Sequence, residues 1–260
     1  KNGDDNQQDQ NEIVEEMIDA GCDVLCVNLV DRTAPSRIIR MAKQEDIPVL
    51  FFNREPVRED LMQWEKLYYI GCNAEQSGIM QGEIAAEYIN SHPEVDKNED
   101  GKIQYVLLEG EAGHQDAVLR TQQSIDTITE AGYKVEKLGD ESANWKRAQA
   151  QSKMTQIINQ EDNIEVVLAN NDDMALGAID AFKNSSRDIP IIVGIDGHAE
   201  ALKSINSGEL AGSVYNDNVG QAKAMLEIAY ALGTDNEIPA SVNMEHRTVR
   251  LPYEIVTVDN

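Results

Sequence analysis

Residues 166–195 read VVLANNDDMALGAIDAFKNSSRDIPIIVGI, and this stretch decides the fold class. It opens with an apolar run that suits a buried strand, residues 166–170, and continues with apolar residues at helical spacing over residues 173–182. A second apolar run follows at residues 189–195. Two buried strands joined by a helix form the crossover unit of a parallel sheet, so the stretch predicts an α/β protein.

The same alternation of helix and strand extends from this stretch toward both ends of the chain. Expected strands are short apolar runs, and they fall at residues 24–30, 48–52, 68–72, 106–108, 133–138, 211–215 and 253–258. Expected helices have apolar residues three and four apart, and they fall at residues 12–20, 36–44, 73–90, 115–131, 146–158, 199–206 and 218–232. The length and this pattern together predict two α/β lobes.

Composition narrows the classes of function. The 260 residues include 47 Asp and Glu against 22 Lys and Arg, so the formal net charge is −25. Nucleic acid and anionic lipid are not expected as main partners, because phosphate binding depends on clustered Lys and Arg. No apolar run approaches the roughly 18 residues that span a bilayer.

The cysteines and histidines suggest no catalytic or zinc site. Three cysteines, Cys22, Cys26 and Cys72, are too few for a disulfide framework, and we expect them to be buried thiols. Cys22 and Cys26 would lie roughly 13 Å apart along a strand, beyond the reach of a disulfide. The chain has no G-x-S-x-G elbow, no phosphate-binding loop and no zinc-ligand spacing of histidines.

Residues 96–104, DKNEDGKIQ, have the spacing of a calcium-binding loop. Side chains with oxygen atoms stand at loop positions 1, 3, 5 and 9, namely Asp96, Asn98, Asp100 and Gln104. Gly101 permits the sharp turn at position 6, and Lys102 at position 7 would provide a backbone carbonyl. Position 12 is Leu107 instead of a glutamate, so the last carboxylate must come from elsewhere. The alternative interpretation is a solvated acidic turn.

Polar residues follow the carboxyl ends of the expected strands, where ligands bind in open α/β folds. They are amides, carboxylates and one histidine: Asn53, His114, Asp116, Asn171, Asp196 and Asn216. Such side chains suit a polyhydroxylated ligand, because as a set they donate and accept hydrogen bonds in planar geometry. A single Asn or Asp at such a junction is more often a helix N-cap, but five or six together favour a binding site.

Arg120 and Trp145 extend this set. Arg120 stands four residues after Asp116, so the two can pair on one helix face and offer hydrogen bonds to vicinal hydroxyls. The alternative is an exposed helix ion pair worth a few tenths of a kcal/mol. Trp145 is a large aromatic residue in a polar loop and can stack on the apolar face of a sugar ring, although a tryptophan is more often simply packed.

Several strings of the sequence resemble the family of periplasmic galactose/glucose-binding proteins, which are the receptors of sugar ABC transporters. They are VNLVD at 27–31, VLFFNREP at 49–56, DKNEDGKIQ at 96–104, GHQD at 113–116, VLANND at 167–172 and GID at 194–196. The resemblance implies the type I periplasmic binding protein fold, in which two Rossmann-like lobes with mostly parallel sheets are joined by a three-segment hinge. The N-terminal lobe would comprise residues 1–71 and 216–250, and the C-terminal lobe residues 72–215 and 251–260.

The resemblance also implies roles for individual residues. Sugar would be bound by Asn53 from the first lobe and, from the second lobe and hinge, by His114, Asp116, Arg120, Trp145, Asn171, Asp196 and Asn216. Calcium would be held by the loop residues Asp96, Asn98, Asp100, Lys102 and Gln104, and by a distant glutamate that corresponds to Glu165. The lobes would close on one D-galactose or D-glucose, and the receptor would deliver this hexose to the membrane permease of an ABC transporter.

Two features depart from the family. Family members begin with a strand, a helix and a second strand that this sequence lacks, so we expect it to be a fragment. The family's contact patch for a chemotaxis receptor would fall at residues 33–36, where Ser36 stands in place of a glycine. The resemblance otherwise implies a monomeric receptor without enzymatic activity, either in the periplasm or anchored by lipid at the cell surface.

Two other classes of protein stay open. The effector-binding core of a sugar-responsive transcription repressor shares this architecture, but a repressor would need a basic helix-turn-helix, which this sequence does not supply. A calcium-dependent carbohydrate enzyme would need two carboxylates about 5 to 9 Å apart across a bound sugar.

Overall fold

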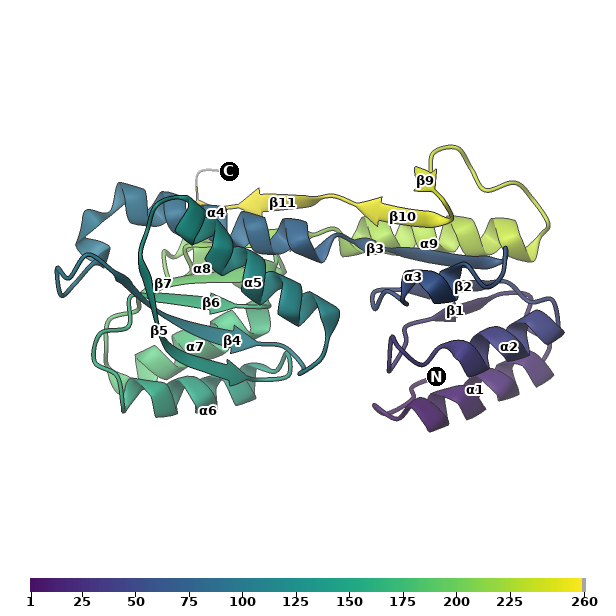
Figure 1. Cartoon of the computed structure of the whole chain (residues 1–260), viewed down its shortest axis with the longest axis horizontal. Helices are drawn as coiled ribbons and strands as arrows, with labels where there is room; N and C mark the ends of the chain where they lie inside the picture. Colours follow the sequence, from purple (N-terminus) through teal and green to yellow (C-terminus); the bar gives the residue numbers. More distant parts are fainter. Residues whose placement is uncertain (259–260) are drawn as a thin grey trace. The chain divides into compact units, whose positions relative to one another are not determined.

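The computed structural model describes residues 1–258 and consists of two compact units (Figure 1). Unit 1 comprises Lys1–Cys72 and Asp217–Pro252, and unit 2 comprises Asn73–Asn216 together with the segment that begins at Tyr253. The chain therefore passes from one unit to the other after residues 72, 216 and 252. Among the described residues, none of the helices is both long enough and apolar enough to cross a membrane.

Unit 1 is built on a five-stranded sheet with the order β1-β2-β3-β10-β9. All neighbours are parallel except the β10–β9 pair, and the strands are β1 Leu25–Val27, β2 Val49–Phe52, β3 Leu67–Cys72, β10 Thr248–Leu251 and β9 Met244–Glu245. Helices α1 (Gln7–Asp19) and α2 (Ser36–Gln44) share one core cluster with Phe51. Helix α9 (Asn218–Gly233) shares another cluster with Leu50, so helices cover both faces of the sheet.

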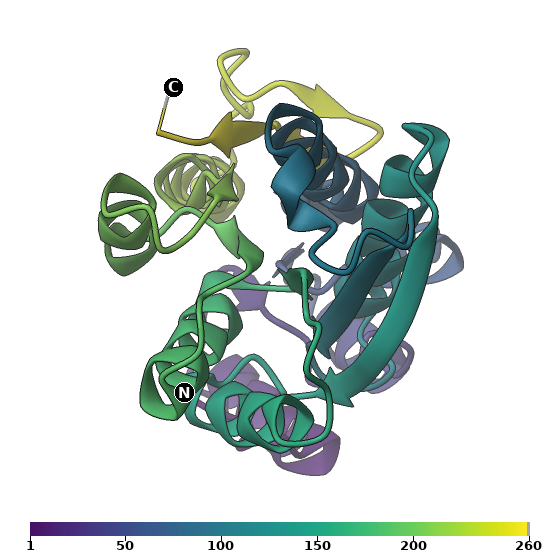
Figure 2. The same cartoon turned by 90° about the vertical axis from the view of Figure 1, so that its left-hand side faces the viewer.

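Unit 2 is built on a six-stranded sheet with the order β11-β8-β7-β6-β4-β5. All neighbours are parallel except the β11–β8 pair, and the strands are β4 Ile103–Glu109, β5 Val135–Ser142, β6 Val166–Ala169, β7 Ile191–Asp196, β8 Gly212–Asn216 and β11 Tyr253–Val256. Figure 2, in which this unit faces the viewer, shows helices on both sides of the sheet. One side has α6 (Arg147–Ile158), α7 (Asp172–Ser185) and α8 (Ala199–Asn206), and the other has α4 (Ala74–Ser91) and α5 (Gln115–Glu130).

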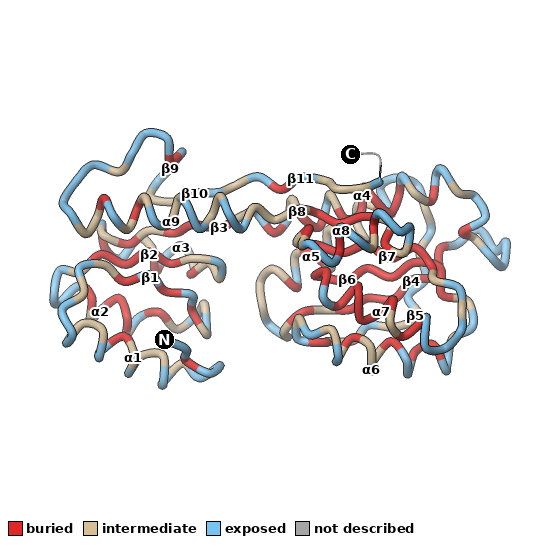
Figure 3. Tube along the Cα trace, turned by 180° about the vertical axis from the view of Figure 1, so that it is seen from behind, coloured by how far each residue is buried: buried red, intermediate tan, exposed pale blue. Residues whose placement is uncertain are grey.

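Buried residues follow the central strands of both units (Figure 3). The sequences VLFF of β2 and VVLA of β6 are apolar at every position, because helices cover both faces of these sheets. The continuous apolar runs of the sequence reflect this arrangement, and the prediction of an α/β fold with mostly parallel sheets is confirmed.

The strand expected at residues 24–30 is wrong in its length and in the burial of its cysteine. It spans only Leu25–Val27, because the side chain of Gln10 bonds both the carbonyl of Asn28 and the N–H of Val30. Cys26 is exposed because Leu25 and Val27 face α1 and α2, whereas Cys26 points to the opposite face of an edge strand, where the α9 cluster includes no residue of β1. Cys22 and Cys72 are partly exposed, so the expectation of three buried thiols is also wrong.

A glycine in α4 allows helix α5 to approach closely. A Cβ atom at Gly82 would lie 2.7 Å from the carbonyl oxygen of Ser124 and 2.6 Å from Cβ of Thr127. Neither atom can move aside unless the helix shifts, because both are fixed close to the backbone of α5. This contact therefore sets the position of α5, whose first turns carry several residues of the candidate site.

We expect Gly82→Ala to lower the free energy of unfolding by about 1–3 kcal/mol through overpacking, although Ala favours a helix over Gly by about 1 kcal/mol. Urea denaturation measures the change. Glu83→Ala, at the adjacent exposed position, is the control and should stay within about 0.5 kcal/mol of the parent chain. An unchanged or higher denaturation midpoint for Gly82→Ala would contradict this description of the α4–α5 contact.

Candidate functional site

A buried guanidinium, that of Arg120 in α5, lies at the centre of the candidate site in unit 2. The residue is only 5% exposed. It donates hydrogen bonds to the carbonyl oxygen of Asn170 at 2.8 Å, to Oγ of Ser77 at 3.2 Å and to the hydroxyl of Tyr253 at 3.1 Å. Burial alone would lower the pKa of Arg120, but the surrounding hydroxyl and carboxylates raise it, so the group stays charged.

His114 and Asp116 stand at the start of α5, beside this guanidinium. Oδ2 of Asp116 lies 3.6 Å from Nη2 of Arg120, so the ion pair expected from the sequence is present. The N–H of Asp116 donates to Nδ1 of His114 at 3.1 Å. His114 is therefore the N-cap of the helix, and its neutral ring would carry the proton on Nε2.

Trp145 lies in the loop after β5, with its ring against Arg120. The ring centroid is 5.9 Å from the guanidinium carbon and 5.1 Å from the centroid of the His114 ring, which meets it edge-on. Asn144 and Trp145 both have left-handed backbone conformations, with φ of 50° and 64°. Gly110 provides the space, because a Cβ atom there would lie 2.1 Å from the indole ring. The strained loop and the glycine together place an aromatic ring at the strand ends.

Asp196 and Asn216 are the last residues of β7 and β8. The side chain of Asn216 hydrogen-bonds the carboxylate of Asp196, whose φ of 132° is rare for a residue with a side chain. Burial raises the pKa of Asp196 to about 6. The charge of Arg120 opposes this rise, and the charge of Asp172 adds to it.

Asp172, the first residue of α7, holds the turn that follows Asp196. Asp172 is fully buried, and its carboxylate accepts hydrogen bonds from Oγ of Ser213 at 2.6 Å and from the N–H of His198 at 3.1 Å. Oγ of Ser213 also accepts a hydrogen bond from the N–H of Gly197 at 3.1 Å. These bonds fix residues 197 and 198 from two other elements, so they stabilise the strained conformation of Asp196.

The structure places every predicted sugar ligand in unit 2 except Asn53. Asn171 caps α7 by accepting from the N–H of Met174, and its amide donates to the carbonyl of Trp145 at 3.4 Å. Asn53 follows β2 in unit 1, where it has φ of 61° and its carbonyl accepts from the hydroxyl of Tyr69 at 2.9 Å. The geometry thus brings together the predicted ligands that follow the strands of unit 2.

Sequence reasoning missed the residues that support this arrangement: Ser77, Asn170, Asp172, Ser213 and Tyr253. Asn170 and Asp172 belong to the VLANND string, in which the sequence predicts a ligand only at their neighbour Asn171. Tyr253 is 133 positions from Arg120 in the chain, and no local pattern connects the two. It reaches the site because β11 runs antiparallel to β8 and begins where β8 ends.

The predicted calcium loop, residues 96–104, lies at the other end of β4, and its last two residues are the first two of that strand. It is folded on its own oxygens, since the carboxylate of Asp96 accepts hydrogen bonds from the N–H groups of Asp100 and Gly101. Oδ1 of Asn98 also accepts from the N–H of Asp100, at 3.1 Å. The turn at residues 96–101 is therefore held by hydrogen bonds from its own backbone N–H groups to its own side-chain oxygens.

Glu165 joins this loop from the residue before β6. It is 1% exposed, and its carboxylate accepts hydrogen bonds from the N–H of Lys97 at 2.7 Å and from that of Gln104 at 2.9 Å. No group of three or more His, Cys, Asp or Glu side chains within residues 1–258 is arranged to hold a metal ion. The predicted donors also include amide and carbonyl oxygens, a mixed set that fits calcium, and calcium stays a prediction.

Comparison with known proteins identifies the family. The sequence model of one protein family, described as the periplasmic binding protein domain, matches residues 1–237. This chain belongs to the periplasmic binding protein family. The members of this family are binding proteins, and those related to this chain work outside the cytoplasm.

Relatives and solved structures support this assignment. The D-galactose/methyl-galactoside binding periplasmic protein of Haemophilus influenzae is 39% identical over 258 residues, which are 98% of this chain and 78% of that protein. The putative rhizopine-binding protein of Rhizobium meliloti is 33% identical over 250 residues, which are 95% of this chain and 75% of that protein. An ABC transporter solute binding protein of Bacillus halodurans with bound myo-inositol has a TM-score of 0.84 at 28% identity, covering 99% of this chain and 82% of that one. The predicted type I periplasmic binding protein fold is confirmed.

The raised pKa of Asp196 predicts a specific dependence of stability on pH. The pKa is about 6 in the folded protein against an ordinary 3.8, so this carboxyl stabilises the fold fully below pH 3.8 and loses that contribution as the pH rises through 6. As the pH rises from 4 to 7, we expect the free energy of unfolding of the parent chain to fall by about 2–3 kcal/mol relative to that of Asp196→Asn. Urea denaturation at each pH measures this difference. Asp162→Asn, at an exposed position, should follow the parent, and parallel pH profiles for Asp196→Asn and the parent would contradict the assignment.

Proposed function

We propose that this protein is an extracytoplasmic receptor, in the periplasm or anchored at the cell surface, for one hexose of the D-galactose or D-glucose type. It would deliver the hexose to the membrane permease of an ABC transporter. The observation that supports this best is the buried, charged Arg120, flanked by Asp116 and by the ring of Trp145. The relatives also bind rings with several hydroxyls, since one is named for D-galactose and another holds myo-inositol.

Each part of the site suits one feature of a hexose. Arg120 and the carboxylates of Asp116 and Asp196 can hold vicinal hydroxyls, because the guanidinium donates and the carboxylates accept. The amides of Asn171 and Asn216 both donate and accept. The indole of Trp145 offers an apolar face to the C–H surface of a pyranose ring. The protein already orders these groups, so binding sacrifices little conformational entropy in the site.

The proposal also includes three predictions from the sequence that do not concern unit 2 alone. Two of them concern unit 1, and one concerns both units. Asn53 remains a predicted ligand from unit 1. Closure of the two lobes on the sugar remains predicted, with the chain crossings as its hinge. A contact with a chemotaxis receptor remains predicted near Thr33–Ser36, at the start of α2.

Titration calorimetry with D-galactose and D-glucose, followed by chromatography of the recovered sugar, tests the proposal. A receptor binds one sugar molecule per chain and returns it unchanged. Recovery of a converted sugar would favour a carbohydrate enzyme instead. Absence of binding by both hexoses at millimolar concentration would contradict a hexose receptor.

Trp145→Ala should weaken hexose binding by about 1–3 kcal/mol, which is roughly 5- to 150-fold in Kd, because a desolvated aromatic anchor contributes strongly to affinity. Calorimetry on a variant with unchanged circular dichroism measures the loss. Tyr230→Ala removes an aromatic ring that is 72% exposed on α9, and it should leave the affinity unaltered. Equal affinities for all three proteins would exclude Trp145 from the sugar site.

We also propose that calcium binds to the loop of unit 2, through Asp96, Asn98, Asp100, Gln104, Glu165 and the carbonyl of Lys102. The support is the burial of the Glu165 carboxylate close to a second carboxylate, that of Asp96, which a divalent cation would compensate. A bound ion would link the loop to the start of β6. It would be structural, because the loop precedes β4 whereas the Arg120 site follows that strand.

Removal of calcium should therefore destabilise the protein. With free calcium at a hundredfold its Kd, the ion would contribute about 2.7 kcal/mol, so EGTA should lower the melting temperature by several degrees. Glu165→Gln should melt at a lower temperature and respond little to EGTA. Glu99→Gln removes an exposed carboxylate from the same loop and should respond as the parent does. A parent chain whose melting temperature ignores EGTA would speak against the calcium site.

A further inference from the structure

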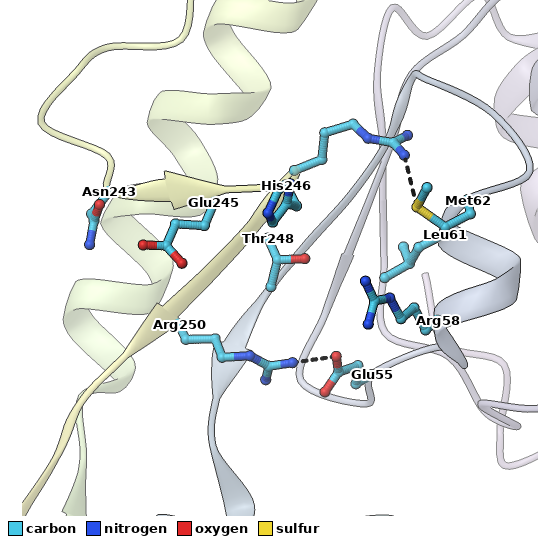
Figure 4. Close-up of a pocket in the computed structure, with 10 residues that line it drawn as sticks. Glu55, Arg58, Leu61, Met62, Asn243, Glu245, His246, Thr248 and Arg250 are labelled. Carbon is cyan, nitrogen blue, oxygen red and sulfur yellow. Dashed lines mark hydrogen bonds and ion pairs between the residues drawn. The ribbon is translucent and has the colours of Figure 1, made fainter.

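A cavity of about 550 Å³ opens in unit 1 between the short helix α3 (Arg58–Leu61) and the β9–β10 hairpin (Figure 4). Its lining includes three arginines, Arg58, Arg247 and Arg250, and we call it the arginine groove. The lining belongs entirely to unit 1, and none of its residues takes part in the proposed sugar or calcium site. The groove is thus separate from both proposed sites.

Positive charge prevails in the lining of the arginine groove, whereas the net charge of the whole chain is negative. Three arginines line it against two glutamates, Glu55 and Glu245, whereas the chain has 22 basic and 47 acidic residues. Glu55 pairs with Arg250, and Figure 4 shows Glu245 beside Asn243, away from Arg58. Within residues 1–258, Arg58 and Arg247 form no ion pair. The groove therefore offers cationic groups without a carboxylate partner.

Two of the arginines are held firmly in place. Both residues of the hairpin turn, His246 and Arg247, have left-handed backbone conformations, with φ of 49° and 64°. The guanidinium of Arg247 donates to the carbonyl oxygens of Trp64 and Leu67. The guanidinium of Arg250 lies 5.6 Å from the centre of the Tyr69 ring. Binding by these groups sacrifices little side-chain entropy, because their conformations are already fixed.

The open shape of the groove indicates a protein partner. Met62 is 64% exposed, and Arg58, His246 and Arg250 are exposed as well. Such a surface cannot enclose the 70–90% of a small ligand that binding pockets usually bury. Arginine and methionine are enriched at protein interfaces, and Leu61 adds an apolar side chain to the lining.

We propose that the arginine groove is a docking surface for an acidic segment of a partner protein. A segment rich in Asp and Glu is repelled by most of a surface with a net charge of −25 and attracted by this groove, so the charge pattern fixes where it binds. The carboxylates of the segment pair with Arg58 and with the remaining donors of Arg247 and Arg250. The proposal stands independently of sugar binding.

Fluorescence anisotropy with a labelled hexaglutamate peptide, blocked at both ends, tests the proposal at 50 mM NaCl. We expect saturable binding by the parent chain that weakens strongly at 300 mM NaCl, because the contacts are exposed and screened. Arg58→Gln should weaken binding about five- to tenfold. Arg40→Gln removes the same charge from an exposed position on α2 and should bind as the parent does. Both positions are exposed, so both variants should melt with the parent.

Absence of peptide binding by the parent chain overturns the proposal, and so does an equal loss of affinity in Arg58→Gln and Arg40→Gln. If inorganic phosphate displaces the labelled peptide at a concentration equal to that of the peptide, the groove accepts a small anion. That result would also overturn the proposal of a protein docking surface.

Discussion

Burial of one positive charge, the guanidinium of Arg120, is the constraint on which the candidate site of unit 2 depends. A buried charge without partners would cost several kcal/mol, so each N–H group must meet an acceptor. The hydrogen-bond acceptors come from elements far apart in the chain, namely Ser77 of α4, the carbonyl of Asn170 after β6 and the hydroxyl of Tyr253 in β11, and Asp116 in α5 itself adds an ion pair. Satisfying this one group therefore fixes the relative positions of four elements around the site.

The same place concentrates features that a stable fold would otherwise avoid. Trp145 and Asp196 have unusual backbone conformations, and the carboxyl of Asp196 is buried enough for its pKa to reach about 6. Parallel strands bring such residues to one edge of the sheet. There, neighbouring loops and the N-termini of α5 and α7 can compensate the energetic cost of the strain and of the burial. Strain and unfavourable burial are the expected costs of holding polar groups ready for a ligand.

The fold was largely predictable from the sequence, whereas the support of the site was not. Strands such as β6 are buried on both faces and appear as apolar runs, so local composition sufficed. The Asp116–Arg120 spacing predicted an ion pair but not its burial, which depends on Tyr253, 133 positions away from Arg120. The β9–β10 hairpin was missed because its turn residues, His246 and Arg247, lack the usual Asn-Gly signal.

A crystal structure determined with saturating D-galactose tests the central claim most directly, namely that the side chains around Arg120 form a sugar site. The account predicts one hexose whose hydroxyls bond Arg120 and Asp116 and whose C–H face lies on the ring of Trp145. It also predicts that the hydrogen bonds from Arg120 to Asn170 and Tyr253 persist. A galactose bound elsewhere, with these side chains facing only solvent, would contradict it.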